Sequence, residues 1–442
     1  MPYFSDYVLD SQGNVIPSAT VSVVNAAGTA PSLYSDAART TAKTQPFTTN
    51  SSGFYEFYVA PGTYTITAQS GGFSQTKTVE LGFPGVEFVT DFGALGNGTN
   101  DDTSAIQAAI DSFSAGGTLR FPRGTYRLTD SLKTKRGLRL VGDGWFATIL
   151  SGTSMAVPMF KDTSTYTYKD GGMQGMTLVG NTSAAGNHLV QVSTLGVNRY
   201  IFDSVRFYEC GGDALHIESL IASSQAGSYQ NAVRDCIFGD PANASVIRIK
   251  GHAIFALGSV NGWVIDKPTI YRTHSTAIYL EGRTGSDTLS TWMIRDASIE
   301  GIGADNVLPT FGVYATGHVE SIRCYGGFME GNGVADTSFA SANFCVNAST
   351  GNYGTFEVRG VTMASTPYHI RVINGYGGLI EGNRFSWNGT NPDAGNKKFC
   401  ISLEDINSST GQYRIGHNDN FTTSYELLSS TAATSSQISI LT

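Results

Sequence analysis

Apolar and polar residues alternate through the first part of the chain. Between residues 6 and about 81, three runs place an apolar side chain at every second position, as a half-buried strand requires. Turn-forming residues precede and separate them, at 10–14 and 60–63. We therefore predict a small antiparallel β-sandwich over residues 1–84. The three runs are Thr20–Val24, Tyr55–Val59 and Tyr64–Ala68.

A helical pattern follows a Gly-Pro linker at 82–85. Apolar residues recur at the spacing of one helix face, at positions 106, 109, 110 and 113. Ser104 and Gln107 have the spacing of a capping box, which favours a helix start near Thr103. Gly116 and Gly117 should end this helix.

A repeat occupies the chain beyond residue 170. Short segments ending in one bulky apolar residue, here called an anchor, recur at intervals of 29 to 35 residues, as in a solenoid. Each anchor is followed by a variable turn and a second alternating strand, so we expect two strands and two turns per coil. Such units bury their apolar sides only by stacking. The anchors are Leu178, Phe207, Phe238, Ile270, Ile299, Phe328 and Met363, and the second strands are 214–217, 246–249, 277–280, 312–315 and 368–372.

The region between the sandwich and the repeat resembles a known family. Its motifs, in chain order, are Asp91–Ala94, Asp101–Thr103, the helix, Phe121–Tyr126 and Gly142–Gly144. They resemble the opening of the pectate-lyase-3-like domains of bacteriophage tailspikes. This resemblance implies a right-handed parallel β-helix whose N-terminal end is capped by the helix, and a homotrimeric assembly. The first 84 residues resemble transthyretin-like or carboxypeptidase-regulatory-like modules of phage tails.

We therefore expect an all-β chain with four parts. They are the β-sandwich at 1–84, either virion-proximal or an auxiliary carbohydrate-binding module; the cap and first coils of the β-helix at 85–150; the β-helix body with the binding face at 151–425; and a different C-terminal segment at 426–442. The repeat weakens after residue 385.

Composition and charge narrow the partners. The chain of 442 residues contains 52 Gly, 21 Tyr and 24 Phe but only 14% charged residues, which is typical of β-rich proteins with many turns. The net charge is −8, and the Lys and Arg residues are scattered, so we expect no nucleic-acid partner. The chain start lacks a basic and apolar leader and no long apolar run follows, so we expect neither classical secretion nor membrane insertion.

The five cysteines lie far apart, at positions 210, 236, 324, 345 and 400. Neither the spacing of a metal or redox site nor the density of a disulfide framework is present. We predict five reduced, buried thiols. We expect no cofactor and see no compact motif for a metal ion.

Candidate substrate-binding residues come from the outward positions of the second strands, because inward positions form the core. With residues 215, 247, 278 and 313 inward, two outward rows mix carboxylates, bases and tyrosines, which suit sugar hydroxyls and sugar C–H faces. A solvated face with cross-coil salt bridges explains the same pattern. The first row is His216, Arg248, Tyr279 and Tyr314, and the second is Glu218, Lys250, Glu281 and Thr316.

Candidate catalytic residues are acids. Glycoside hydrolysis uses two carboxyl groups, separated by about 5 to 9.5 Å. Four acids follow anchors, at Glu209, Asp240, Glu300 and Glu330, and the first three of these are our candidates together with Asp213. Asp213 lies in a segment that resembles the first acid of polygalacturonase-like hydrolases, although His216 replaces the second acid. Solvated turn residues are the alternative interpretation.

A lyase would use different groups. It needs a base for the proton next to a uronate carboxylate, and a cation to neutralise the enolate, for which positions 248, 250 and 283 offer Arg or Lys. His252, His274 and His318 are interpreted as hydrogen-bonding surface residues.

The combined prediction is a tailspike that binds and depolymerises a bacterial capsule or O-antigen, with hydrolysis favoured over elimination. It would be assembled with other tail or baseplate proteins in the host cytoplasm and act at the bacterial surface. A non-catalytic receptor-binding fibre is the alternative. The sugar specificity stays open at this stage.

Overall fold

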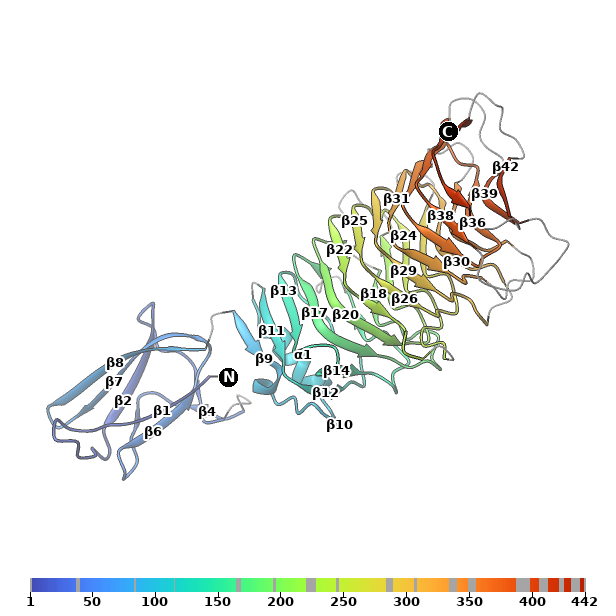
Figure 1. The fold of residues 1–442 in the computed structure, drawn as a ribbon. Coiled ribbons are helices and arrows are strands. Elements are labelled where there is room, and N and C mark those ends of the chain that lie inside the picture. The colour runs from blue at the N-terminus through green and yellow to red at the C-terminus, as the bar shows by residue number, and fades with distance from the viewer. Residues whose placement is uncertain are drawn as a thin grey trace.

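The computed structural model describes residues 2–440 except for 37–39, 83–84, 115, 164–167, 194–195, 220–227, 244–245, 284–288, 306–307, 334–339, 349–354, 387–397, 405–411, 421–424 and 431–437. A sandwich at the N-terminal end is followed by one long stack of coils (Figure 1). The chain colours run in order along the stack, so coils that neighbour in sequence also neighbour in space. Within the described residues, no helix is long and apolar enough to cross a membrane.

The sandwich consists of two four-stranded antiparallel sheets. Their facing sides enclose a separate core that includes Val21, Phe57 and Ile66. The predicted alternating runs are strands here, which confirms the sandwich. One sheet has the order β1 (Tyr3–Tyr7), β6 (Phe54–Tyr58), β3 (Leu33–Tyr34), β4 (Ala42–Lys43); the other has the order β5 (Phe47–Thr48), β2 (Thr20–Asn25), β7 (Gly62–Ser70), β8 (Phe73–Leu81).

The cap contains β9 (Val86–Phe88), a short 3-10 turn (Val89–Phe92), β10 (Asn97–Asp101) and the helix α1 (Thr103–Asp111). The predicted apolar face is confirmed: Ile106, Ala109 and Ile110 are fully buried. The capping box is wrong. The N-cap is Asp102, and the Asp101 carboxylate accepts the Thr103 backbone N–H at 3.0 Å, so Ser104 lies inside the helix.

The β-helix has three strands in each full coil, not the two that we predicted. Three parallel faces result, here called faces 1, 2 and 3. A residue with positive φ, such as Asp235 (48°), Lys267 (50°) or Asp296 (49°), bends the chain between faces 1 and 2. The sequence analysis predicted only one strand before the second strand of each coil, because the bend between faces 1 and 2 is so short.

The strands of each face pair in parallel along the axis. Face 1 contains β11 (Gly117–Phe121), β13 (Leu138–Gly142), the first parts of β17 (Gly172–Val179) and β20 (Ile201–Glu209), then β22 (Asn231–Arg234), β25 (Trp263–Asp266), β28 (Trp292–Arg295), β31 (Ser321–Tyr325), β34 (Thr355–Arg359), β37 (Gly377–Glu381), β40 (Gln412–Ile415) and β43 (Ile438–Ile440). Face 2 contains β12 (Gly124–Arg127), β14 (Thr148–Ser151), the second parts of β17 and β20, then β23 (Ile237–Phe238), β26 (Thr269–Tyr271), β29 (Ser298–Glu300), β32 (Phe328–Glu330), β35 (Thr362–Ala364), β38 (Arg384–Ser386) and β41 (Asp419–Asn420).

Face 3 is a ten-stranded sheet, and a two-stranded ladder of β16 (Tyr168–Lys169) and β19 (Val197–Asn198) lies beside it in the early coils. Face 3 contains β15 (Phe160–Lys161), β18 (Val190–Val192), β21 (Leu215–Ser219), β24 (Ile254–Gly258), β27 (Ile278–Gly282), β30 (Phe311–Gly317), β33 (Ala342–Ala348), β36 (Tyr368–Ile373), β39 (Lys398–Glu404) and β42 (Tyr425–Ser430). Both β42 and β43 pair in parallel with the preceding coil, so the stack extends to Ile440, beyond the boundary predicted near residue 425.

The core runs through the whole stack. All predicted anchors are fully buried except Phe328, whose neighbour Met329 takes the inward position instead. Aromatic rings stack between coils, with Trp263 and Trp292 centroids 5.5 Å apart. The five cysteines are buried and unpaired, as predicted.

Candidate functional site

Three equivalent positions at the entrance to face 3 bring a carboxylate and two histidines together. Parallel pairing aligns Val190, Leu215 and Ile254, and the residue two positions before each of them is His188, Asp213 or His252 respectively. The sequence proposal named Asp213 but interpreted His252 as a surface residue and did not consider His188. Counting back two residues from each strand of face 3 would have placed all three in one row.

Asp213 is the centre of this cluster. It is 7% exposed, and its carboxylate is 2.6 Å from His216 Nδ1 and 2.8 Å from His252 Nδ1. It also accepts the backbone N–H of His252 at 2.7 Å. Burial alone would raise the pKa of Asp213, but the hydrogen bonds from His216 and His252 outweigh it and hold the pKa well below its usual range. The carboxylate is therefore ionised near neutral pH.

An ionised carboxylate can only accept hydrogen bonds, which fixes both imidazoles. His216 and His252 must each donate through Nδ1, so their chemistry takes place at Nε2. Burial lowers the pKa of His216, but the hydrogen bond to Asp213 outweighs it, and the net pKa is raised. His216 Nε2 lies 3.2 Å from the Glu218 carboxylate, so a proton can be held between them.

His188 has the opposite protonation pattern. Its Nδ1 accepts the backbone N–H of Asp213 at 2.9 Å, which places its proton on Nε2. Burial lowers the pKa of His188, which favours its neutral form. Its ring packs on His216 with centroids 4.4 Å apart. His188, Asp213 and His216 each offer a ligand atom, all within 4.8 Å of one another, so they could hold a metal ion. A bound ion would have to displace the hydrogen bonds just described.

An aromatic row extends from this cluster along face 3. The register pairs His216, Phe255, Tyr279 and Tyr314 in successive coils. Phe255 stacks between His216 at 4.7 Å and Tyr279 at 5.4 Å, measured between ring centroids. Three of these four residues were predicted. The second place in the predicted row, assigned to Arg248, belongs to Phe255.

A hollow of 420 Å³ lies beside this row. His252 is the member of the histidine cluster that lines this hollow, and the wall of the hollow is mainly apolar. Polar side chains line it from four strands, and Asn347 donates to the Tyr314 hydroxyl at 3.1 Å. Its lining residues are His252, Ser275, Thr276, Tyr279, Leu308, Pro309, Thr310, Phe311, Tyr314, Ala340, Cys345, Asn347, Arg371 and Ile373.

The predicted second row is partly confirmed by the register. Glu218 and Glu281 lie in one row with Leu257 between them, and Thr316 follows. The Tyr279 hydroxyl donates to Glu281 at 2.9 Å. Lys250 lies outside this row, because residues 246–249 belong to the loop before β24. Apolar and polar residues alternate in that loop as in a strand, and Ile249 is buried. The sequence pattern therefore placed this loop among the second strands.

Two predicted catalytic acids lie in an arginine network instead. Glu209 pairs with Arg248, and Asp240 pairs with Arg206 at 3.1 Å. Both guanidinium groups pack on the Tyr208 ring, 4.4 and 4.9 Å from its centroid. This network satisfies each carboxylate with a positive partner. It lies at the end of β20, not in the hollow.

Glu300 forms a third location. It lies on face 2, in register with Glu330, and accepts the Ser298 hydroxyl at 2.8 Å. With Met329 as the anchor, both glutamates directly follow their anchors, whereas Glu209 and Asp240 follow theirs by two residues. The four acids therefore do not form one ladder. The roles proposed for Glu209, Asp240 and Glu300 stay predictions.

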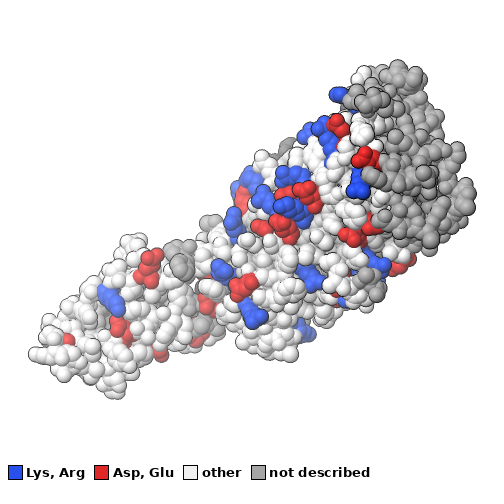
Figure 2. All heavy atoms as spheres, in the orientation of Figure 1, with Lys and Arg blue, Asp and Glu red and all other residues white. Residues whose placement is uncertain are grey.

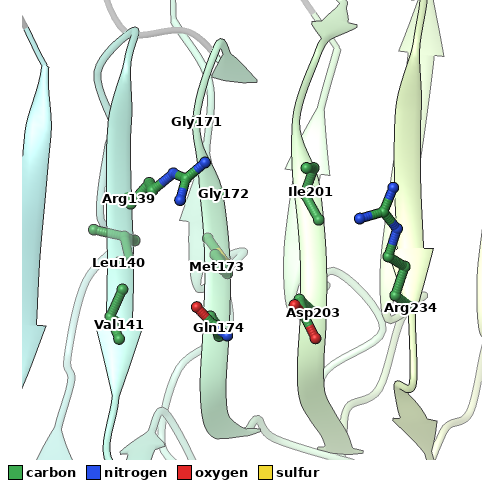
Figure 3. A pocket seen from close by; sticks show the side chains of 10 residues that line it. All are labelled: Arg139, Leu140, Val141, Gly171, Gly172, Met173, Gln174, Ile201, Asp203 and Arg234. Carbon is green, nitrogen blue, oxygen red and sulfur yellow. The ribbon is translucent and has the colours of Figure 1, made fainter.

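A second hollow, of 260 Å³, lies on face 1 (Figure 3). Arg139 and Arg234 flank it, and Gln174 and Asp203 point out from the strands between them. Charged side chains also gather over the middle of the β-helix (Figure 2). On face 1, ion pairs cross between coils, such as Arg295 with Asp266 at 3.2 Å. The described residues that line this hollow include neither a carboxylate pair nor a histidine, so face 3 offers the richer chemistry.

Comparisons with known proteins agree with this architecture. Residues 88–302 match the family described as rhamnogalacturonase A/epimerase, pectate lyase-like, and residues 7–86 match the carboxypeptidase regulatory-like domain. The predicted resemblances are confirmed: the coils form a pectate-lyase-like right-handed β-helix.

Individual relatives match over shorter stretches. Mannuronan C5-epimerase AlgE1 of Azotobacter vinelandii is 38% identical over 106 residues, which cover 21% of this chain and 8% of that protein. Alginate lyase 7 of the same organism is 42% identical over 71 residues, which cover 14% of this chain and 8% of that protein. ORF18 of Geobacillus virus E2 has a TM-score of 0.50 at 16% identity, covering 81% of this chain and 68% of that chain. The last comparison shows a shared fold.

Proposed function

We propose that this protein is a phage tail component that binds a bacterial surface polysaccharide along face 3 and cleaves it at the Asp213 cluster. One observation carries the proposal: the buried Asp213 carboxylate holds two histidines, and one of them, His252, lines an aromatic-walled hollow. Sugar rings stack on aromatic faces, and imidazoles near neutral pH transfer protons. The tail location rests on the resemblance of residues 86–150 to tailspike domains, and ORF18, which shares the fold, is named for a virus.

The cluster suits β-elimination from a uronate-containing chain. His252 Nε2 can take the proton from the carbon next to the carboxylate, and the electron pair then forms a carbon–carbon double bond as the glycosidic C–O bond breaks. Protonated His216 can neutralise the developing charge and give its proton to the leaving oxygen. Asp213 stays ionised and stabilises His216 in its charged form. The similarity to a protein named alginate lyase 7 is consistent with this reaction.

Hydrolysis is the second candidate, and a separate observation favours it. Glu218 and Glu281 lie two coils apart in one row. At about 4.8 Å per coil their backbones are separated by about 9.6 Å, near the upper limit for an inverting carboxylate pair. This pair is an addition to the predicted acids Glu209 and Asp240, which pair with arginines.

An assay on a panel of capsular, O-antigen and alginate polysaccharides separates these candidates. New reducing ends with rising absorbance near 232 nm, the expected signal of an unsaturated uronate, would support elimination. Reducing ends without that absorbance would support hydrolysis. A protein that binds chains but never shortens them would overturn cleavage and leave a receptor-binding fibre. Native mass measured in parallel tests the homotrimer.

A further inference from the structure

The outer face of the first sandwich sheet carries an unexpected group of aromatic rings. Side chains alternate along β1 and β6, so Phe4, Tyr55 and Phe57 point into the sandwich core, while their neighbours point outward. The outward positions are Tyr3, Ser5 and Tyr7 on β1 and Phe54, Glu56 and Tyr58 on β6. The cross-strand partners are Tyr3 with Tyr58, Ser5 with Glu56, and Tyr7 with Phe54.

These rings form two pairs on an open surface. Tyr3 and Tyr58 have centroids 5.1 Å apart, and Tyr7 and Phe54 have centroids 5.2 Å apart. Tyr3 is 46% exposed and Tyr7 is 52% exposed. Cross-strand aromatic pairs stabilise a sheet, yet so much exposed ring surface in one patch is characteristic of a binding surface. Few charged atoms cover the sandwich end in Figure 2.

Polar groups lie between the two pairs. Ser5 and Glu56 are directly opposite each other, and the Tyr3 hydroxyl donates to the Glu56 carboxylate at 2.7 Å. The pairs are four residue steps apart along the strand, a distance of about 13 Å. Along the strands, the surface therefore presents one ring pair, then the Ser5 hydroxyl and the Glu56 carboxylate, and then the second ring pair.

We infer that this surface, here called the aromatic platform (Tyr3, Ser5, Tyr7, Phe54, Glu56 and Tyr58), is a second polysaccharide-binding site. A sugar chain lying along β1 and β6 would stack C–H faces on both ring pairs and donate hydroxyl hydrogen bonds to Glu56 between them. A charged protein partner would need more charge than the platform offers. Because the platform is in a different domain from Asp213, it goes beyond the proposed reaction.

The function of such a site is to hold the polymer while the β-helix acts on it. Two sites on one chain convert the second binding event into an intramolecular one, which raises the overall affinity for a long polymer by about 100-fold or more. Short oligosaccharides cannot span both sites, so the platform should not affect their turnover.

Affinity electrophoresis of the full chain tests this inference. The native gels contain alginate, polygalacturonate, or a capsular or O-antigen polysaccharide. The tested protein carries Asp213→Asn or His252→Gln, so that it does not cleave the polymer in the gel. The double substitution Tyr3→Ala and Tyr7→Ala, added to either of these two proteins, should reduce retardation by the polymer at least about 10-fold in one or more gels. Tyr229→Ala, which removes a ring that is 46% exposed on the β-helix, is the matched control and should have no effect.

The outcomes are distinct from those of the cleavage assay. Unchanged retardation of the Tyr3→Ala/Tyr7→Ala protein in every gel, or no retardation of either background in any gel, would overturn the inference. A protein with Tyr3→Ala and Tyr7→Ala but an intact Asp213 cluster should still cleave short oligosaccharides. That assay tests the proposed cleavage and not the platform. Normal sugar binding combined with failure to join phage particles would assign the platform to virion assembly and overturn the inference as well.

Discussion

Equivalent positions in successive coils are close neighbours in space, and this decides what single residues can do. Asp213 lies between His188 and His252 because all three precede their face 3 strands by two residues. A carboxylate in that position can orient imidazoles from two other places in the chain. The same stacking places Arg206 and Arg248 around Asp240, where the charges are used for ion pairing.

His216 gives a pH prediction. Its folded pKa is raised above the unfolded value, so its interaction with Asp213 stabilises the fold fully below about pH 6.5. This contribution is lost as the pH rises through the folded pKa. The difference in unfolding free energy between the parent and His216→Gln, measured by urea titration, should therefore shrink from pH 6 to pH 9. A difference that is constant over this range would contradict the raised pKa.

Asp240 gives a prediction that separates structure from catalysis. Asp240→Asn removes the charge that compensates Arg206 and partly compensates Arg248, both largely buried. Breaking such a pair costs about 3 kcal/mol, measured by denaturant unfolding. At temperatures where the variant is folded, its cleavage rate should stay within about twofold of the parent, because Asp240 lies in the arginine network and not in the hollow. A stable variant without activity would instead support the predicted catalytic role of Asp240.

Sequence reasoning found part of the site. His216, Tyr279 and Tyr314 were predictable because alternation places them outward in strands with clear apolar partners. Phe255 was not, because the loop at 246–249 imitates a strand and shifts the register of one coil. His188 and His252 were not, because their role depends on equivalence across coils, which appears only after the strands are aligned correctly.

At the scale of elements, the corners set the geometry of each coil. Face 1 turns into face 2 through the left-handed region. In the middle coils the residue there is Asp235, Lys267 or Asp296, and in the later coils it is glycine, at Gly326 with Gly327, Gly360 and Gly382. The sequence revealed the repeat but not this corner, because several residue types occupy it. The helix was predictable from its apolar spacing, but its cap depends on Asp101 and Asp102, which precede the predicted start.

A pair of substitutions tests the corner. Asp296 has a φ of 49°, where a β-branched side chain clashes with the backbone and glycine does not. Asp296→Val should lower the free energy of unfolding by about 1 to 2 kcal/mol, while Asp296→Gly should leave it within about 1 kcal/mol of the parent. Thermal and urea unfolding of the two proteins measure the difference. Equal stability of both variants would show that the corner tolerates any residue.

At the scale of the whole molecule, the stack of coils carries the proposed cleavage site, and the sandwich carries the aromatic platform. The β-helix class was predictable because its core needs a bulky apolar residue in every coil. The number of faces was not, since a one-residue bend leaves almost no signal. Stacked coils give a flat, extended face, which suits a long polymer better than a closed pocket.

The most direct test of the central claim is the length distribution of the polysaccharide after incubation, measured by size-exclusion chromatography with light scattering. The parent protein should shorten at least one surface polysaccharide. Asp213→Asn should bind that polymer but shorten it at least about 100-fold more slowly, because both imidazoles lose the group that fixes their tautomer. Shortening by Asp213→Asn at the parent rate, in a folded protein, would contradict the assignment of the reaction to this cluster.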